Sequence, residues 1–455
     1  MMEENGNKPL NPITLSLLAL LTGVVAGLGA VFFRGLIALF HNLLFMGVLS
    51  FNYDANAHTP ASPWGPFVIL VPVAGAICVS FIVTKFAPEV KGHGVPEVMD
   101  AIYFHKGIIR PIVALMKALA SAVSIGSGGS VGREGPIVQI GSSFGSTLGQ
   151  IIRMPVGQRI TLISAGTAGG IAATFNTPIG GMMFALELMT HEVSVRTLIP
   201  IAIATATATY IGQLVFGTHP SFVIPALQTP YFHLYNPEVL LSYVGLGVVM
   251  GLASTIYIKS IYGMEDLFDR IKGGYYIRHM AGMLVVGIMM YAMMVCFKHY
   301  YIEGVGYAAI QDVLTGSLSS LYILLLLFAL KLLATSLSLG SGGSGGIFSP
   351  ALFMGATLGG AYGIFLNQVF PRLNISPAAF AVAGMAGIVG GAIGAAVTAI
   401  VMIFEMTLDY SVILPMLITV TFSYGVRKIL SDESIYTLKI VRRGHRLPEA
   451  LHRIE

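Results

Sequence analysis

Long apolar runs without a single charged residue recur along the chain, separated by shorter polar segments. They are Ile13–Phe33, Phe67–Thr84, Leu198–Phe216, Val239–Tyr257, Met280–Phe297 and Val313–Leu330. A helix needs about 20 apolar residues to cross a bilayer, so each run predicts a membrane-spanning helix. A polar segment, Phe51–Trp64, separates the first two runs. The pattern predicts an all-α polytopic membrane protein in a lipid bilayer.

The composition agrees with a membrane setting. Of 455 residues, 55% are hydrophobic and 10% are charged, whereas soluble proteins carry about 25% charged residues. Basic residues gather near the C-terminus: Arg427, Lys428, Lys439, Arg442, Arg443, Arg446 and Arg453. Because segments rich in Lys and Arg stay in the cytoplasm, we expect a cytoplasmic C-terminus. This cluster also accounts for the net charge of +4, which therefore indicates no nucleic-acid partner.

Two glycine-rich stretches with the same pattern lie 214 residues apart. Gly126–Gly149 reads GSGGSVGREGPIVQIGSSFGSTLG, and Gly340–Gly363 reads GSGGSGGIFSPALFMGATLGGAYG. In each, glycines permit a sharp bend, a proline suits the first helical turn, and an apolar helix with regularly spaced glycines follows. Each stretch therefore predicts a helix N-terminus with free N–H groups inside the membrane. Two such ends make an anion site without a formal positive charge.

Other landmarks repeat in the same order. Two further segments match at an offset of 218 residues, Ala165–Thr190 and Ala383–Thr407. This offset places Glu187 on Glu405, and matched positions favour a shared structural role in which each carboxylate accepts bonds from an opposing loop. The Gly-x-Gly at Gly92 has a counterpart at Gly304. A duplicated membrane domain with interrupted helices predicts a transporter whose binding site lies between the halves. The residues alone do not determine whether the halves are parallel or inverted.

Rival classes fit these residues less well. A phosphate-binding reading of the glycine loops fails because no GK[ST] ending follows either loop. No metal-ligating or paired-acid motif indicates an enzyme, and we expect neither a cofactor nor a metal. The two cysteines, Cys78 and Cys296, lie in apolar runs, and we expect two buried thiols rather than a disulfide. Lys117, also in an apolar segment, is expected to compensate negative charge or to raise the positive potential of the pore, and it is not counted as a site residue.

Three loops carry a family resemblance. They are GHGVP at Gly92–Pro96, GREGP at Gly132–Pro136 and GIFSP at Gly346–Pro350. In order and spacing they resemble the signature loops of the CLC family of chloride channels and H⁺/Cl⁻ exchangers. The resemblance implies two inverted-repeat halves whose broken helices meet at a central anion site. It also implies one anion pore per protomer, a homodimer, and a location in a prokaryotic plasma (inner) membrane.

The resemblance assigns site residues. Backbone N–H groups of Gly135, Ile347 and Phe348 would line the chloride path. Glu134 would be the gating glutamate, whose carboxylate competes with the anion. Tyr436 would supply a hydroxyl to the central ion. His93 stands where the family usually has serine, and an imidazole N–H can still donate to an anion.

Two mechanisms remain, which differ in whether chloride movement is coupled to protons. The family's exchangers generally carry an inner proton-transfer glutamate where this chain has Leu188, directly after Glu187. Leucine cannot carry a proton, so the sequence favours passive chloride conduction, gated by Glu134 in response to voltage or pH. The alternative is a coupled H⁺/Cl⁻ exchanger in which His93 or water relays the proton.

These features predict four parts of the chain. Residues 1–10 form a cytosolic N-terminus, and residues 11–230 the first transmembrane repeat. Residues 231–430 form the second repeat. Residues 431–455 form a pore-lining helix and a cytosolic tail, with no CBS domain.

Overall fold

The computed structural model describes residues 9–190, 193–224 and 237–446. Over these ranges the chain is built of helices and connecting loops and has no β-strand. Eight of the helices are long and apolar enough to cross a membrane. The all-α membrane fold predicted from the sequence is confirmed.

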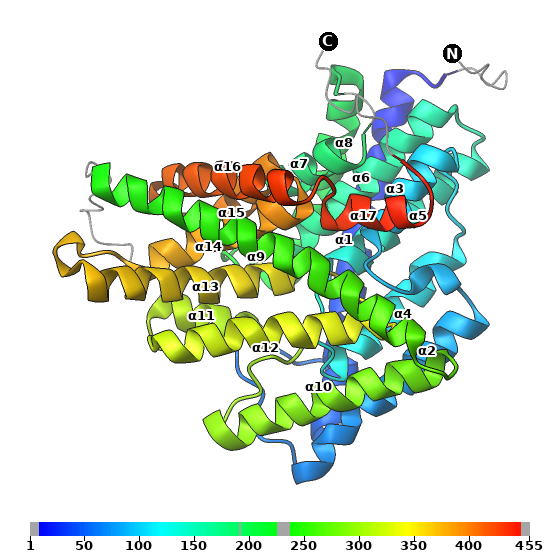
Figure 1. The fold of residues 1–455 in the computed structure, drawn as a ribbon. Helices are drawn as coiled ribbons and strands as arrows, with labels where there is room; N and C mark the ends of the chain where they lie inside the picture. The colour runs from blue at the N-terminus through cyan, green and yellow to red at the C-terminus, as the bar shows by residue number, and fades with distance from the viewer. Residues whose placement is uncertain (1–8, 191–192, 225–236, 447–455) are drawn as a thin grey trace.

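The two halves contain matching helices (Figure 1). The first half consists of α1 (Pro12–His41), α2 (Val71–Lys85), α3 (Val95–Phe104), α4 (Ile112–Gly126), α5 (Glu134–Ile151), α6 (Val156–Phe175), α7 (Pro178–Leu188) and α8 (Val195–Phe216). The second consists of α9 (Pro237–Arg270), α10 (Tyr275–Phe297), α11 (Tyr307–Thr315), α12 (Leu321–Gly340), α13 (Phe348–Val369), α14 (Pro377–Ile393), α15 (Ala396–Thr407), α16 (Ile413–Leu430) and α17 (Ile435–Arg442). Helices α3, α4 and α5 correspond to α11, α12 and α13.

The halves meet as inverted repeats at the glycine loops. Gly132 N–H donates to the Gly346 carbonyl at 2.7 Å, and Gly346 N–H donates to the Gly132 carbonyl at 2.7 Å. These two glycines are equivalent positions of the repeat. A second reciprocal set joins Ser121 to Ser344 and Ser130 to Thr335, at 2.9 and 3.3 Å. Exchange of the same bonds in both directions is what a two-fold relation between the halves produces.

Regularly spaced glycines let neighbouring helices touch. A Cβ atom on Gly141 of α5 would lie 2.1 Å from the carbonyl oxygen of Gly166 on α6. In the second half, a Cβ on Gly355 of α13 would lie 2.4 Å from the carbonyl oxygen of Gly384 on α14. Side chains at these positions would push the helices apart, which explains the small-residue spacing.

One predicted span is wrong. The run Val313–Leu330 is not a single helix, because α11 ends at Thr315 and α12 begins at Leu321. Gly316 has φ +79° and caps the end of α11. A glycine in the left-handed region ends a helix at little cost, so an apolar run can contain a turn. The other five runs each lie within helical segments.

The predicted burial of the cysteines is also wrong. Cys78 on α2 and Cys296 on α10 are both exposed and unpaired. Both helices keep one apolar face uncovered by protein, and the thiols lie on those faces. Of the predicted parts, residues 1–8, the boundary at 230–231 and residues 447–455 lie outside the described residues.

Candidate functional site

The Glu134 side chain crosses from one half of the protein to the other. It leaves the N-terminus of α5, and its carboxylate accepts bonds from Ser349 in the first turn of α13. The Ser349 N–H donates to Oε1 at 2.6 Å, and the Ser349 hydroxyl donates to Oε2 at 3.0 Å. The side chain is 1% exposed. These carboxylate oxygens occupy a helix N-terminus and stand in for a bound anion.

Two glycines make room for this carboxylate. A Cβ atom on Gly132 would lie 2.1 Å from Glu134 Oε1, and one on Gly346 would lie 2.9 Å from the same oxygen. These are the same glycines that exchange hydrogen bonds across the pseudo-two-fold axis. Because any side chain here would displace the carboxylate, the two loops together form a cradle for one anionic group.

The three predicted backbone donors lie beside this cradle. Gly135 is in the first turn of α5, while Ile347 and Phe348 begin α13. The first N–H groups of a helix have no acceptor within the helix. Gly135 also packs so tightly against the His93 carbonyl that a Cβ would lie 1.8 Å from its oxygen. The structure therefore brings the α3, α5 and α13 loops together.

Three buried tyrosines surround the same region. The Tyr257 hydroxyl donates to the Ile347 carbonyl at 3.0 Å, and the Tyr262 hydroxyl donates to the Ile435 carbonyl. Tyr436 is 1% exposed, and both it and Tyr257 lie within electrostatic reach of Glu134. The sequence analysis named Tyr436 and did not name Tyr257. The only sequence signal for Tyr257 was a tyrosine within an apolar run.

His93 lies at the tyrosine cluster. Its ring is 3% exposed and meets the Tyr262 ring edge-on at 6.3 Å between centroids. Its Nδ1 is buried without a hydrogen-bond partner among the described residues. An unpaired ring nitrogen in this place suits either a bound anion or a water molecule.

The loop that carries His93 is held by hydrogen bonds to its backbone carbonyls. The Lys117 ammonium donates to the carbonyls of Val90 and Gly92 at 2.9 and 2.8 Å, and Ser344 Oγ donates to Val90 at 2.6 Å. Lys117 thus binds the carbonyl oxygens of this loop, and it also lies within electrostatic reach of Glu97. Its equivalent in the second half, Lys331, donates to the carbonyls of Ile302 and Gly304 at 3.1 and 2.8 Å.

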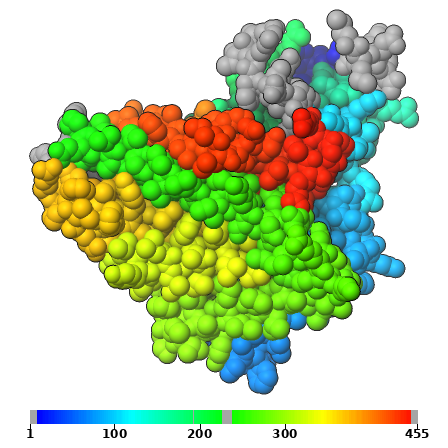
Figure 2. All heavy atoms as spheres, viewed as in Figure 1, coloured from blue at the N-terminus to red at the C-terminus, as the bar shows by residue number. Residues whose placement is uncertain are grey.

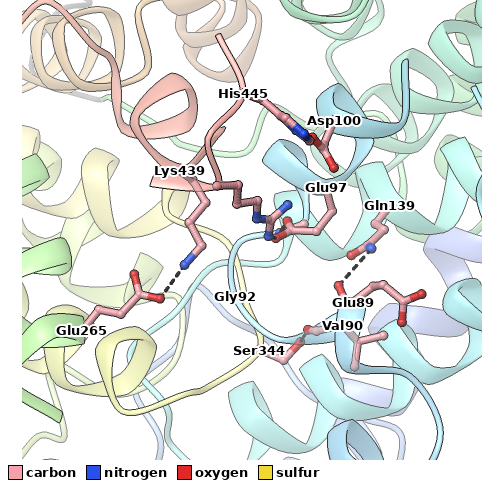
Figure 3. Close-up of polar contacts among 12 residues, drawn as sticks. Glu89, Val90, Gly92, Glu97, Asp100, Gln139, Glu265, Ser344, Lys439 and His445 are labelled. Atoms are coloured by element: carbon pink, nitrogen blue, oxygen red, sulfur yellow. Dashed lines mark hydrogen bonds and ion pairs between the residues drawn. The ribbon is translucent and has the colours of Figure 1, made fainter. Parts of the chain in front are cut away.

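The C-terminal segment clasps the other side of α3 (Figure 3). Glu97 accepts the Gly94 N–H at 2.9 Å and the Arg443 guanidinium at 2.5 Å. His445 Nδ1 lies 2.7 Å from Asp100 on the same helix. A further pair, Lys439 with Glu265 at 2.5 Å, ties α17 to α9. The position of the loop that carries His93 therefore depends on residues near the C-terminus.

Glu187 and Glu405 form a reciprocal pair of helix caps. Glu187 accepts the N–H groups of Val397 and Thr398 at 3.1 and 2.7 Å, at the start of α15. Glu405 accepts those of Ile179 and Gly180 at 3.0 and 2.6 Å, at the start of α7. The predicted bonding to an opposing segment is confirmed. Leu188, next to Glu187, is a buried apolar residue.

Comparison with known proteins agrees with this geometry. Residues 75–428 match the family described as "Voltage gated chloride channel". The chain belongs to the CLC family. Within the described residues, no group of three or more His, Cys, Asp or Glu side chains is placed to hold a metal ion.

CLC relatives cover most of the chain. A ClcB-like protein of Ralstonia nicotianae, named as a chloride channel protein, is 31% identical over 86% of this chain and 90% of its own. The H⁺/Cl⁻ exchange transporter ClcA of Vibrio parahaemolyticus is 34% identical over 78% of this chain and 75% of its own. The crystal structure of a slow cyanobacterial Cl⁻/H⁺ antiporter superposes with a TM-score of 0.82 at 24% identity, covering 95% of this chain and 98% of that one. The likeness to that structure shows the fold, and CLC-type chloride transport follows from the family.

Proposed function

We propose that this protein exchanges chloride for protons across a membrane, with Glu134 as the group that carries the proton. The observation that supports this most directly is the Glu134 carboxylate bound by Ser349 at the start of α13. In that position an ionised carboxylate excludes chloride. A protonated Glu134 loses its charge and leaves the helix end to the anion. Because the same carboxylate either excludes chloride or carries a proton, Glu134 couples the movements of the two ions.

The names of the relatives favour exchange over the passive conduction that Leu188 suggested. ClcA proteins related to this chain over most of its length are named H⁺/Cl⁻ exchange transporters. With leucine at the inner position, the proton reaches Glu134 from the α17 side through water or through His93, whose Nδ1 has no partner among the described residues. Gly135, Ile347, Phe348 and Tyr436 bind the anion along this route.

The orientation and assembly belong to the same proposal. The basic residues near the C-terminus favour an orientation in a prokaryotic inner membrane with α17 on the cytoplasmic side. The protein works as a homodimer with one anion path in each protomer.

Flux measurement in proteoliposomes tests the exchange. In opposed chloride and pH gradients, the reversal potential should shift with both ions, and an imposed chloride gradient should drive protons uphill at a fixed ratio. A reversal potential that follows chloride alone would show a passive channel and overturn the proposal. Liposomes carrying Glu134→Gln provide the matched control, because that side chain cannot take up a proton.

A further inference from the structure

We infer that Ser349 and Tyr307 form a two-hydroxyl proton relay between Glu134 and a pocket on the face opposite α17. The inference rests on the proposed role of Glu134. The Ser349 hydroxyl contacts Glu134 Oε2 at 3.0 Å, and the Tyr307 hydroxyl contacts the Ser349 hydroxyl at 3.0 Å. Ser349 is fully buried and Tyr307 is 1% exposed. The chain of contacts is continuous and shielded from bulk water.

The directions of the hydrogens follow from their number. A serine hydroxyl has one hydrogen, and an ionised carboxylate can only accept. The Ser349 hydrogen therefore points to Glu134, and Tyr307 must donate its own hydrogen to Ser349. Both hydroxyls are aligned toward the carboxylate, which is the arrangement for delivering a proton to it. When Glu134 is protonated, the same chain reverses and carries the proton outward.

The outer end of this chain lies at a pocket. Tyr307 is one of the residues that line the pocket, together with Tyr53, Thr59, Tyr301 and Glu303. These residues come from the loop after α1 and the loop before α11. The pocket lies beyond the C-terminal end of α1. At the other end of α1, the backbone of Leu10 bonds to the Gln158 side chain of α6. In Figure 1, α17 and α3 lie in the upper part of the view, whereas the blue segment that follows α1 lies at the bottom.

Several charged groups lie near the Ser349 and Tyr307 hydroxyls. The Arg133 guanidinium lies 5.1 Å from the centre of the Tyr307 ring, and Arg34 of α1 is within electrostatic reach of Tyr307. In the pocket, Glu303 binds His41 at 2.7 Å. Lys331 is held by two backbone carbonyls. Among the described residues, the hydrogen bonds of Glu303 and Lys331 go to other partners than the Ser349 and Tyr307 hydroxyls.

The inverted repeat provides an internal comparison. The position equivalent to Ser349 in the first half is Gly135, and the position equivalent to Tyr307 is Val95. Neither carries a hydroxyl. The repeat fold therefore forms without such a pair, and of these equivalent positions only those in the second half carry hydroxyls.

The step conserves atoms and charge. A hydronium ion in the pocket gives one proton to the Tyr307 oxygen and becomes water. The Tyr307 hydrogen moves to the Ser349 oxygen, and the Ser349 hydrogen moves to Glu134, which becomes neutral. Neither hydroxyl has to ionise if the three transfers are concerted. Chloride does not pass along this route.

The test removes one oxygen atom at a time. Tyr307→Phe and Ser349→Ala should each slow chloride-driven proton movement by roughly tenfold or more. Tyr301→Phe is the control. It removes the hydroxyl of another tyrosine of the same pocket, one that does not contact Ser349, and this variant should behave as the native protein. Native proton flux in Tyr307→Phe would overturn the relay.

A second set of variants, made in the Glu134→Gln protein, distinguishes a relay from a structural role of Tyr307. Glu134→Gln carries anions without proton uptake, so adding Tyr307→Phe to it should leave anion flux unchanged within about twofold. A similar loss in both backgrounds would mean that Tyr307 acts on the fold, and the relay would be wrong.

A further experiment tests the relay without depending on coupled exchange. A rapid drop in pH on the pocket side should release the Glu134 block and start chloride efflux, even in a protein that exchanges no protons. Tyr307→Phe should delay that onset by roughly tenfold. An unchanged onset would contradict the relay whatever the outcome for exchange.

Discussion

The Glu134 carboxylate is held by neutral donors, not by an opposite charge. Its two oxygens bind one N–H and one hydroxyl of Ser349, and glycines line the remaining space. The guanidinium of the adjacent Arg133 stacks over the rings of Phe175 and Tyr307 instead. A chloride ion can replace the carboxylate on such donors, because the helix end attracts any anion.

Replacing Glu134 with glutamine tests this competition. Protonation of one carboxylate changes by about tenfold per pH unit above its pKa, so native flux should depend steeply on external pH. Glu134→Gln should raise chloride flux and reduce that dependence to less than about twofold per pH unit. The measurement is chloride efflux from proteoliposomes at a series of external pH values, normalised to the amount of protein. A steep pH dependence that survives in the mutant would assign the gate to another group.

Helices α7 and α15 each take the cap for their first turn from the other half of the protein. Glu187, at the end of α7, caps α15, and Glu405, in α15, caps α7. The orphan N–H groups at both helix starts are thereby satisfied. Because the contacts are reciprocal, they also fix the two halves against each other. This explains why the carboxylates recur at matched positions.

Replacing Glu187 or Glu405 with glutamine should lower the stability of the protein and leave the coupling of chloride to protons unchanged. A charge-assisted hydrogen bond contributes about 1.5–3 kcal/mol, so Glu187→Gln and Glu405→Gln should each lower the free energy of unfolding by about 1–3 kcal/mol. Thermal melting in detergent measures this, with the exposed Glu238→Gln as control because surface pairs contribute little. The ratio of chloride to protons should stay at its native value. A changed ratio in Glu187→Gln would instead place that residue on the proton path.

Residues 435–446, at the C-terminal end of the described chain, pack against the first half of the protein. In Figure 2, α17 and the residues that follow it (red) lie against the blue and cyan segments of the first half. Arg443 pairs with Glu97 of α3, and Glu97 in turn accepts the Gly94 N–H. Not every basic residue of the C-terminal cluster lies at the surface. Arg427 is 2% exposed and donates to the Gly391 carbonyl at 2.8 Å.

Loss of the Arg443–Glu97 pair should loosen α3. Glu97→Gln should speed amide hydrogen exchange at the start of α3 by about tenfold, equivalent to about 1.4 kcal/mol, while α13 stays unchanged. The matched control is Asp266→Asn, which breaks the neighbouring pair between Arg442 and α9. If the two variants exchange equally fast at α3, the clasp does not hold that loop.

Much of the architecture could be predicted from the order of residues. Charge-free runs identified most of the spans, and glycine–proline patterns located the starts of α5 and α13. Matched landmarks identified the duplication and the shared role of Glu187 and Glu405. These features are local, since hydrophobic length, glycine conformation and proline position act within one or two helical turns. A local signal also failed at Gly316, where an apolar run concealed a turn.

The contacts that make the site required the folded chain. Ser349 meets Glu134 across 215 residues, and Glu187 meets Thr398 across 211. No local pattern shows which serine will face a carboxylate on another helix. The relay from Tyr307, the support from Tyr257 and the lysine contacts to loop carbonyls have the same origin. Each arises because close packing brings two helix ends together, and a polar group buried there must bond to whatever the packing presents.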